Sequence, residues 1–212
     1  NRIRLRKIER LPKTTRLLRQ FNVDKRIYFF NSRYLNKREV YEALKKHPDT
    51  ESLIPDTRSF GRANLQSMLK AHDEVFMKPN HGSIGKGIYK IKKLVPGRYA
   101  YAAASSTLPV WKGPYAMEAL YQHLRSSAGA KRDYLLQQAI KLARFKSRVF
   151  DVRSQMQKNM QGEWVLTGAA VRVAARNKFV THIPNGGRAE VFEQVMLRVF
   201  PSQRTRKRID AQ

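Results

Sequence analysis

A glycine-containing loop joins two short segments of strand character near the middle of this chain. The first segment, Glu74–Lys78, is mostly apolar and is followed by Pro79, and the second, Ile88–Lys93, alternates in the way a hairpin partner does. Between them lies Gly82-Ser83-Ile84-Gly85-Lys86-Gly87. Glycines let backbone N–H groups turn towards anionic oxygens, and Lys86 adds positive charge at the loop tip. We therefore expect a phosphate-binding hairpin, with a plain glycine-rich turn as the alternative.

The loop departs from the two common glycine motifs that bind phosphate. A Walker A motif needs glycine six residues before its lysine and Ser or Thr directly after it, but the chain has Asn80 and Gly87 there. No helix is expected to begin after the loop, which excludes the helix-dipole phosphate site and the dinucleotide fingerprint. Lys78, at the end of the first strand, is then the expected partner of the loop. The other interpretation of Lys78 is an exposed strand end.

Hydrophobic periodicity assigns most of the remaining chain to helices and strands. Helices are predicted over residues 37–46, 63–70, 116–126 and 190–200. Strands are predicted over residues 27–30, 134–140, 149–157 and 163–175. Residues 53–58 are expected to form a connector and residues 96–114 an irregular excursion. Hairpins mixed with helices indicate an α+β fold with mixed, largely antiparallel sheets and flanking helices.

The chain is strongly basic. Its 43 Lys and Arg residues and 16 Asp and Glu residues give a net charge of +27. This balance favours polyanions such as nucleic acids, nucleotide phosphates or anionic lipid head groups. A solvated surface with few acids explains the same balance, and no recognised DNA- or RNA-binding motif is present. Nucleic-acid binding driven by charge therefore stays one hypothesis among others.

The amino-acid composition excludes several classes of site and of protein. Hydrophobic residues make up 42% of the chain, enough for a packed core. There is no cysteine, which excludes disulfides, thiolate metal sites and cysteine nucleophiles and fits a reducing compartment. No two of the five histidines have metal-ligand spacing. No apolar run approaches the roughly 18 residues of a membrane span, and no signal peptide is visible.

The predicted strands over residues 149–157 and 163–175 carry charged residues that are candidates for a site. Alternation with period two places Asp151 and Arg153 on one face of their strand. Arg172 lies in a stretch of small and apolar residues, where burying an arginine is costly without an anion. Either these side chains line the floor of a cleft, or Asp151 and Arg172 form an internal salt bridge.

Short motifs follow one another along most of the chain. In order, they are Asn36-Lys37, Ile54-Pro55-Asp56-Thr57, Phe76-Met77-Lys78-Pro79, the glycine loop, Leu136-Gln137-Gln138-Ala139-Ile140, Phe150-Asp151-Val152-Arg153 and Thr181-His182-Ile183-Pro184-Asn185-Gly186-Gly187. In this order they resemble ATP-grasp proteins, and most closely the YheC/YheD-like, endospore coat-associated family. The resemblance implies a two-lobe ATP-grasp fold. Residues 1–35 would end an N-terminal region, residues 36–133 would form a linker and the small lobe, and residues 134–212 an incomplete large lobe.

The resemblance also implies roles for individual residues. The positions implied to contact ATP are two lysines, the loop over the phosphates and the adenine-binding stretch: Lys37, Lys78, Gly82, Ser83, Gly85, Lys86, Gly87, Gln137, Gln138 and Ile140. The positions implied to face the substrate or the γ-phosphate are Arg172, Asp151 and Arg153. From the residues alone, Lys37 can equally begin a solvated helix, and Gln137 and Gln138 can lie at a strand edge.

The chain differs from the family pattern at two places. His182 stands where relatives usually have Asn, and a surface histidine is the simpler interpretation of it. ATP-grasp enzymes hold Mg²⁺ with a late acidic residue and a Glu-x-Asn pair, but after Gly187 the acids are Glu190, Glu193 and Asp210. The two glutamates fall in a predicted helix. Mg²⁺ is thus expected from the family without an assigned ligand, and the C-terminal metal-binding strands are expected to be lacking.

These inferences lead to three functional hypotheses. The preferred one is an ADP-forming, ATP-dependent carboxylate–amine or carboxylate–thiol ligase that acts through an acyl phosphate, with carboxylate substrate and nucleophile not identified. The second is a catalytically degenerate, ATP-binding structural component of the spore coat, with other coat proteins as partners. The third is a basic protein that binds nucleic acid or another polyanion. The expected location is the cytoplasm or the spore coat.

Overall fold

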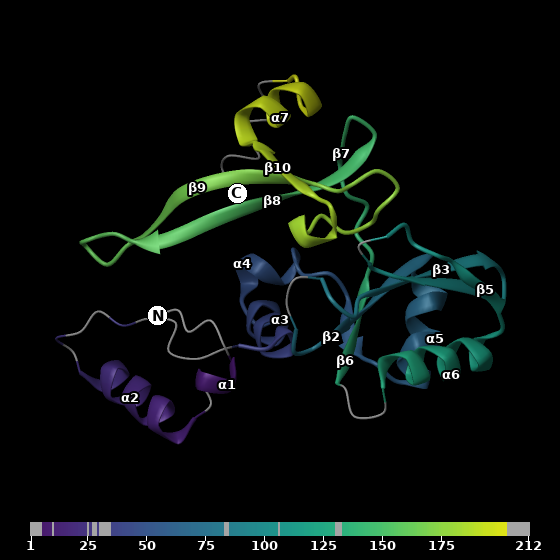
Figure 1. The fold of residues 1–212 in the computed structure, drawn as a ribbon, viewed down its shortest axis with the longest axis horizontal. Coiled ribbons are helices and arrows are strands. Elements are labelled where there is room, and N and C mark those ends of the chain that lie inside the picture. The colour runs from purple at the N-terminus through teal and green to yellow at the C-terminus, as the bar shows by residue number, and fades with distance from the viewer. Residues whose placement is uncertain are drawn as a thin grey trace. The chain divides into compact units, whose positions relative to one another are not determined.

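The computed structural model describes residues 6–9, 11–24, 26, 29, 35–82, 85–105, 107–129 and 133–202. The chain divides into two compact units, Asn1–Glu51 and Ser52–Gln212 (Figure 1). Among the described residues, no helix has both the length and the apolar character needed to cross a membrane.

The described part of the first unit is helical. Its helices are α1 (Arg6–Glu9), α2 (Pro12–Val23), α3 (Lys37–Lys45) and α4 (Pro48–Glu51). Helix α3 confirms the helix predicted over residues 37–46, and a capping box starts it. Asn36 Oδ1 accepts from the backbone N–H of Glu39 at 2.9 Å, and Glu39 Oε2 accepts from that of Asn36 at 2.8 Å. The strand predicted over residues 27–30 lies mostly outside the described residues.

The second unit contains a six-stranded antiparallel sheet. Its strands are β1 (Thr57–Ser59), β2 (Glu74–Pro79), β3 (Tyr89–Val95), β4 (Arg98–Ala103), β5 (Lys112–Tyr115) and β6 (Tyr134–Gln138), in the order β1-β6-β2-β3-β4-β5. The central strand β2 pairs with β6 on one side and with β3 on the other. In this register Phe76 lies opposite both Gln137 and Lys90, and Lys78 lies opposite Leu135. Facing residues in such pairs share one side of the sheet.

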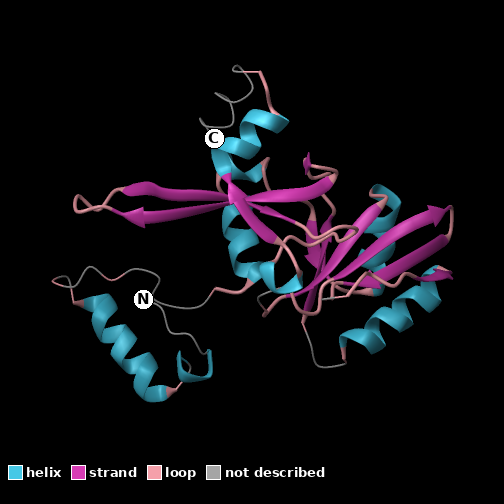
Figure 2. Ribbon diagram, turned by 45° about the horizontal axis from the view of Figure 1, so that its top comes forward, coloured by secondary structure: helices cyan, strands magenta, loops and turns pink. Residues whose placement is uncertain are grey.

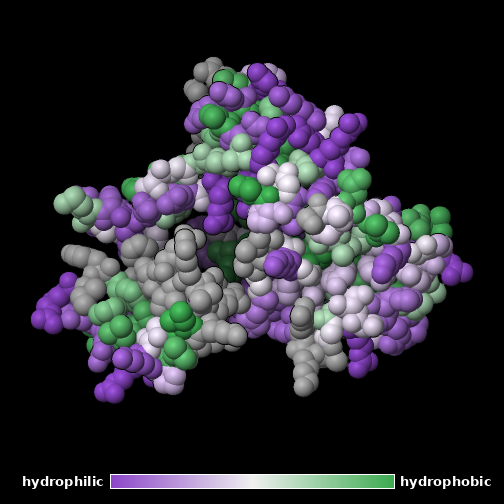
Figure 3. All heavy atoms as spheres, viewed as in Figure 1, coloured by the Kyte–Doolittle hydropathy of each residue, from purple (hydrophilic) through white to green (hydrophobic). Residues whose placement is uncertain are grey.

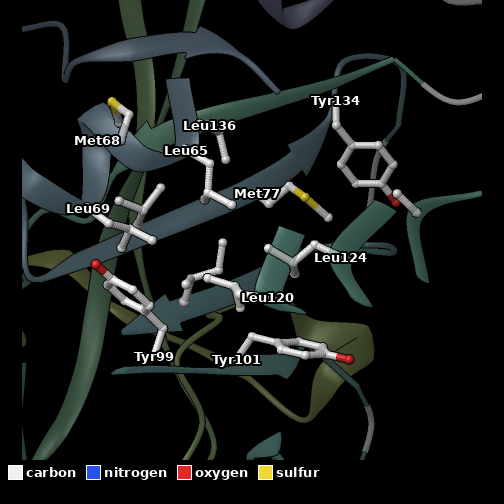
Figure 4. Close-up of a cluster of buried hydrophobic side chains, with 13 residues drawn as sticks. Leu65, Met68, Leu69, Met77, Tyr99, Tyr101, Leu120, Leu124, Tyr134 and Leu136 are labelled. Carbon is white, nitrogen blue, oxygen red and sulfur yellow. The ribbon is translucent and has the colours of Figure 1, made fainter. Parts of the chain in front are cut away.

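Two helices cover one face of this sheet. They are α5 (Arg62–Ala71) and α6 (Met117–Ala128), and their apolar stripes meet the inward side chains of the strands (Figure 4). The buried side chains of this core are Leu65, Met68, Leu69, Val75, Met77, Ile91, Tyr99, Tyr101, Leu120, Leu124, Ala128, Tyr134 and Leu136. Because strand residues alternate between faces, burying Val75 and Met77 here turns Phe76 and Lys78 to the opposite side.

A four-stranded antiparallel sheet follows in the same unit. It consists of β7 (Arg144–Phe145), β8 (Arg148–Lys158), β9 (Trp164–Val173) and β10 (Arg188–Val191), in the order β10-β9-β8-β7. Strands β8 and β9 form a long ribbon (Figure 2). Helix α7 (Phe192–Val199) packs Val195 and Met196 against Phe150, Val171 and Val173. The connection from β9 to β10 contains a short 3₁₀ helix, Ile183–Asn185.

The predicted α+β class with antiparallel sheets is confirmed, but three local predictions are wrong. Residues 96–114 are not an irregular excursion, since they contain β4 and β5. The connector predicted over residues 53–58 runs into β1. Glu190 does not belong to a helix: it lies in β10 opposite Val171, and α7 begins only at Phe192.

Candidate functional site

A cavity of about 210 Å³ lies in the second unit and is lined by residues from both sheets and their connections. Its walls are Phe76, Lys78, Ile88, Gln137, Gln138, Ile140, Leu142, Asp151, Phe179, Val180, Thr181 and His182. Small-molecule sites usually enclose roughly 300–1,000 Å³, so this space suits one compact part of a ligand. Six of the lining residues are apolar and six are polar or charged, so the cavity can hold an apolar ring and also contact polar groups.

Lys78 reaches the cavity from the central strand of the first sheet. Its ammonium lies 5.0 Å from the centroid of the Phe76 ring, a cation–π contact between neighbours on the same strand face. Phe76 also packs against Phe179, with ring centroids 5.9 Å apart. These contacts place the Lys78 ammonium beside an aromatic wall of the cavity.

Gln137 ties Lys78 to the edge of the sheet. Lys78 Nζ donates to Gln137 Oε1 at 2.6 Å, and Gln137 Nε2 donates to Thr57 Oγ1 at 3.0 Å. Thr57 Oγ1 in turn donates to the carbonyl of Pro55 at 2.8 Å. Gln137 is only 5% exposed, so both ends of its amide are satisfied inside the protein. Its side-chain oxygen is therefore engaged by Lys78.

The neighbouring Gln138 is bracketed by the backbone of Asp56. Its N–H donates to the Asp56 carbonyl at 2.8 Å, and its side-chain oxygen accepts from the Asp56 N–H at 3.4 Å. The Asp56 carboxylate accepts from Arg58 Nε at 3.1 Å and Arg58 Nη2 at 2.8 Å, and His72 Nε2 lies 3.3 Å away. The hydrogen bonds from Arg58, with a smaller contribution from His72, hold the pKa of Asp56 below its ordinary value although burial opposes this.

Asp151, at the cavity wall, is engaged by two partners. Arg172 Nε and Nη2 donate to its two carboxylate oxygens at 2.8 and 2.7 Å, and Thr181 Oγ1 donates to Oδ2 at 2.8 Å. The bidentate pair joins facing residues of β8 and β9. Its hydrogen bonds raise the pKa of Arg172 above the ordinary value. The internal salt bridge considered from the sequence is thus present.

The glycine loop is anchored at its base. Asn80 is 3% exposed, and its side-chain Nδ2 donates to Asp133 Oδ2 at 2.7 Å. Its backbone N–H donates to the Asp133 carbonyl at 2.9 Å. Gly85 has φ +73°, and a Cβ there would lie 2.8 Å from Asn185 Nδ2 and 3.0 Å from His182 Nδ1. Only glycine allows the loop to approach the β9–β10 connection this closely.

That connection supplies residues to which the sequence assigned no role. Lys178 Nζ donates to the carbonyl of Asn185 at 2.9 Å and to that of Ser105, just after β4, at 3.2 Å. Phe179 and Thr181 line the cavity. Their signal was already in the chain, because Thr181 opens the last of the ordered motifs and Phe179 precedes it by two residues.

The structure gathers some of the expected site residues and leaves others apart from the cavity wall. Those that line the cavity are Lys78, Gln137, Gln138, Ile140 and Asp151. Arg172 bonds to Asp151, and Gly85 lies against His182. Gly82 follows β2 and packs near Pro79, while a Cβ on Gly87 would lie 3.0 Å from the Tyr134 hydroxyl. Lys86 and Arg153 are exposed and do not line the cavity. Lys37 begins α3 in the first unit, and Ser83 lies outside the described residues.

The described residues do not fit a magnesium site. Mg²⁺ prefers several oxygen ligands in near-octahedral geometry. In the part of the chain that the structure describes, no group of three or more His, Asp or Glu side chains is placed to hold a metal. The carboxylate at the cavity, Asp151, already accepts from Arg172 and Thr181. Glu190 pairs with Arg188 at 3.4 Å, and Asp210 lies outside the described residues.

Comparison with known proteins gives two matches and one negative result. A family model described as YheC/D-like ATP-grasp matches residues 26–212. The endospore coat-associated protein YheD of Bacillus subtilis (strain 168) is 28% identical to the chain over 173 residues. The matched part is 80% of this chain but 37% of YheD, so the chain spans a little over a third of that relative's length. No solved structure matches the chain.

Proposed function

The chain belongs to the YheC/D-like ATP-grasp family, which implies ATP binding, and we propose that it binds ATP at the cavity next to Lys78 and uses it to activate a carboxylate. The observation that carries this proposal is the position of Lys78. Lys78 lines the cavity, and its ammonium donates to Gln137 Oε1 at 2.6 Å. A base in the apolar part of the cavity would leave its phosphates within reach of this cation.

The residues of the site suit the parts of a nucleotide. Ile88, Ile140 and Leu142 offer apolar walls for a purine ring. Lys78 supplies positive charge at the cavity, and the glycines of the hairpin allow its backbone N–H groups to approach an anion. A Cβ would come within 3.0 Å of Asn185 or His182 at Gly85, and within 3.0 Å of the Tyr134 hydroxyl at Gly87, so only glycine lets the loop backbone pack this closely.

Bound ATP supplies the phosphoryl group that turns a carboxylate into an acyl phosphate, from which an amine or thiol displaces phosphate, with ADP as the other product. The chain contributes charge and position to this reaction. Lys78 and the loop N–H groups stabilise negative charge that spreads over the transferred phosphoryl group. Arg172, fixed by Asp151, keeps Nη1 free of that bidentate pair for a second anion. No step is assigned to a metal ion.

Replacing Lys78 by methionine tests the ATP site. Lys78→Met keeps the apolar stem but removes the charge, so we expect ATP affinity to fall by about 100-fold or more, as for a lost charged contact of roughly 3 kcal/mol. Isothermal titration calorimetry measures the change. Lys70→Met, at an exposed position of α5, is the matched control and should bind as the unchanged protein does. Equal ATP affinity in the two variants would remove Lys78 from the site.

A second function is favoured by the engagement of Asp151 and Arg172 with each other. In this alternative the chain binds ATP without turnover, as a structural component associated with the spore coat like its relative YheD. Both functions predict that ATP raises the melting temperature. They differ in product: the ligase releases ADP when offered a carboxylate and an amine or thiol, and the structural component does not. A coupled ADP assay across a panel of such substrates separates them.

A further inference from the structure

One buried amide group next to the glycine loop lacks a hydrogen-bond partner. Asn185, at the end of the 3₁₀ helix Ile183–Asn185, is 9% exposed, and its Nδ2 finds no acceptor among the described residues. Most buried polar groups in proteins are hydrogen-bonded, and an unsatisfied donor costs about 1–3 kcal/mol. Such a cost is tolerated most readily where a ligand supplies the missing acceptor.

The backbone around this amide is held in place. The N–H of Asn185 donates to the carbonyl of His182 at 2.9 Å, and its own carbonyl accepts from Lys178 Nζ at 2.9 Å. The next residue, Gly186, has φ +85° and donates to Ile183 at 2.9 Å. Because both sides of the Asn185 backbone are bonded, its side chain is presented from a fixed turn.

The orphan donor lies against the glycine loop. A Cβ built on Gly85 would lie 2.8 Å from Asn185 Nδ2, so the amide packs directly against the loop at Gly85. The Lys178 ammonium, which donates to the Asn185 carbonyl, adds positive charge at the turn. A neutral donor and a cation beside a glycine loop form a place that favours an anionic oxygen.

We infer that Asn185 Nδ2 donates a hydrogen bond to a phosphate oxygen of the bound nucleotide. The inference rests on the proposed function and adds a phosphate contact from the β9–β10 connection to those from Lys78 and the loop. Asn185 then contacts the phosphates of the nucleotide and does not contact its base. Its removal should weaken ATP binding and leave adenosine binding unchanged.

The test compares ATP with adenosine on Asn185→Asp. This nearly isosteric change replaces the donor by a negatively charged acceptor, so ATP affinity should fall by about tenfold or more. Adenosine, which has no phosphate, should bind as it does to the unchanged 212-residue chain. Asn177→Asp is the matched control, because it makes the same charge change at an exposed position eight residues earlier and should leave both affinities unaltered. Calorimetry gives all six constants.

The outcomes separate this inference from the proposed function. If the unchanged chain binds no ATP, the proposed function fails and the inference fails with it. If the unchanged chain binds ATP and Asn185→Asp binds it within twofold, only the inference is overturned. Equal losses for ATP and adenosine also overturn it, because they indicate a structural role. Should Asn185→Asp be unfolded in circular dichroism, Asn185→Ala removes the donor without adding charge, and the same ATP-to-adenosine comparison decides.

Discussion

Lys78 is a charged residue of a strand whose ammonium group is fixed at the site by hydrogen bonds. Its ammonium is the first link of a chain that runs through Gln137 and Thr57 to the carbonyl of Pro55. The bonds from Lys78 to Gln137 and from Gln137 to Thr57 join neighbouring strands, so the position of the charge is set by strand pairing. Charge that is positioned in advance needs little reorganisation when a phosphate arrives.

Asp56 gives this edge of the sheet a defined pH dependence. Since its pKa is lower in the folded protein than the ordinary 3.8, the ionised carboxylate stabilises the fold above that value. The contribution is lost as the pH falls through the lowered pKa. We expect Asp56→Asn to reduce the free energy of unfolding by about 1–2 kcal/mol at pH 7, and this difference to shrink below about pH 4. Urea titrations at both pH values measure it.

Asp73→Asn serves as the control for the Asp56 experiment. Its carboxylate pairs with Lys93 at 3.0 Å, but the side chain is 85% exposed, and such surface pairs contribute little. A small effect at both pH values is expected. If the two variants lost equal stability at pH 7, the hydrogen bonds from Arg58 and His72 would not be the source of the Asp56 contribution.

The sequence allowed individual site residues to be predicted, but it did not allow the hydrogen bonds between them to be predicted. Lys78 and Gln137 were both expected at an ATP site, yet the bond between them spans 59 residues of sequence and depends on β2 and β6 being neighbours. The Asp151–Arg172 pair was foreseen as an alternative, because opposite charges lay in two predicted adjacent strands. Asn185 belongs to the last of the ordered motifs, but the sequence could not show that its side chain is buried without a partner.

Alanine substitutions at two matched glycines test whether the hairpin formed by β2, the glycine loop and β3 contributes to ATP binding. Gly85 and Gly97 both have positive φ, +73° and +75°, so alanine at either should cost roughly 1–2 kcal/mol of stability. A Cβ at Gly97 meets nothing within 4 Å, whereas one at Gly85 meets Asn185 and His182. We expect only Gly85→Ala to weaken ATP binding as well, as measured by calorimetry beside urea unfolding.

Gly97→Ala carries the cost of positive φ alone. The difference between the two variants therefore reports the effect of the contact that Gly85 makes with Asn185 and His182. Equal ATP affinities for the two variants would show that the approach of the loop to the β9–β10 connection does not matter for the nucleotide. Weaker binding in Gly97→Ala than in Gly85→Ala would contradict the placement of the site altogether, because Gly97 lies in the exposed turn between β3 and β4.

Elements with one buried face were predictable, and elements outside that pattern were not. Helices α5 and α6 show single apolar stripes, which is why their predicted positions are confirmed within a few residues. Strand β4 is buried on both faces from Tyr99 to Ala102, so it lacks the alternation that marks a strand. Strand β10 runs into α7 without a turn residue between them, which hid the boundary at Phe192.

The whole molecule is dominated by its positive charge. Even if each of the 16 acidic residues paired with a basic one, 27 of the 43 Lys and Arg side chains would lack an acidic partner. Hydrophilic side chains are spread over all parts of the visible face instead of gathering in one place (Figure 3). Repulsion among so many like charges works against the compact state, whereas the few acidic partners limit what ion pairs can contribute.

Salt should therefore stabilise this protein. Raising NaCl from about 20 to 200 mM shortens the Debye length from roughly 20 to 7 Å, which screens repulsion between separated cations more than the close pairs such as Asp151–Arg172 at 2.7 Å. We expect the melting temperature to rise by about 2–4 °C, equivalent to roughly 1 kcal/mol.

Choline chloride at equal ionic strength is the control, and it should raise the melting temperature by the same amount if screening is the cause. A short DNA duplex should stabilise the chain at 20 mM and lose that effect at 200 mM, as general charge attraction requires. A melting temperature that falls as salt is added would mean that ion pairs outweigh the repulsion, and the net charge would then not govern stability.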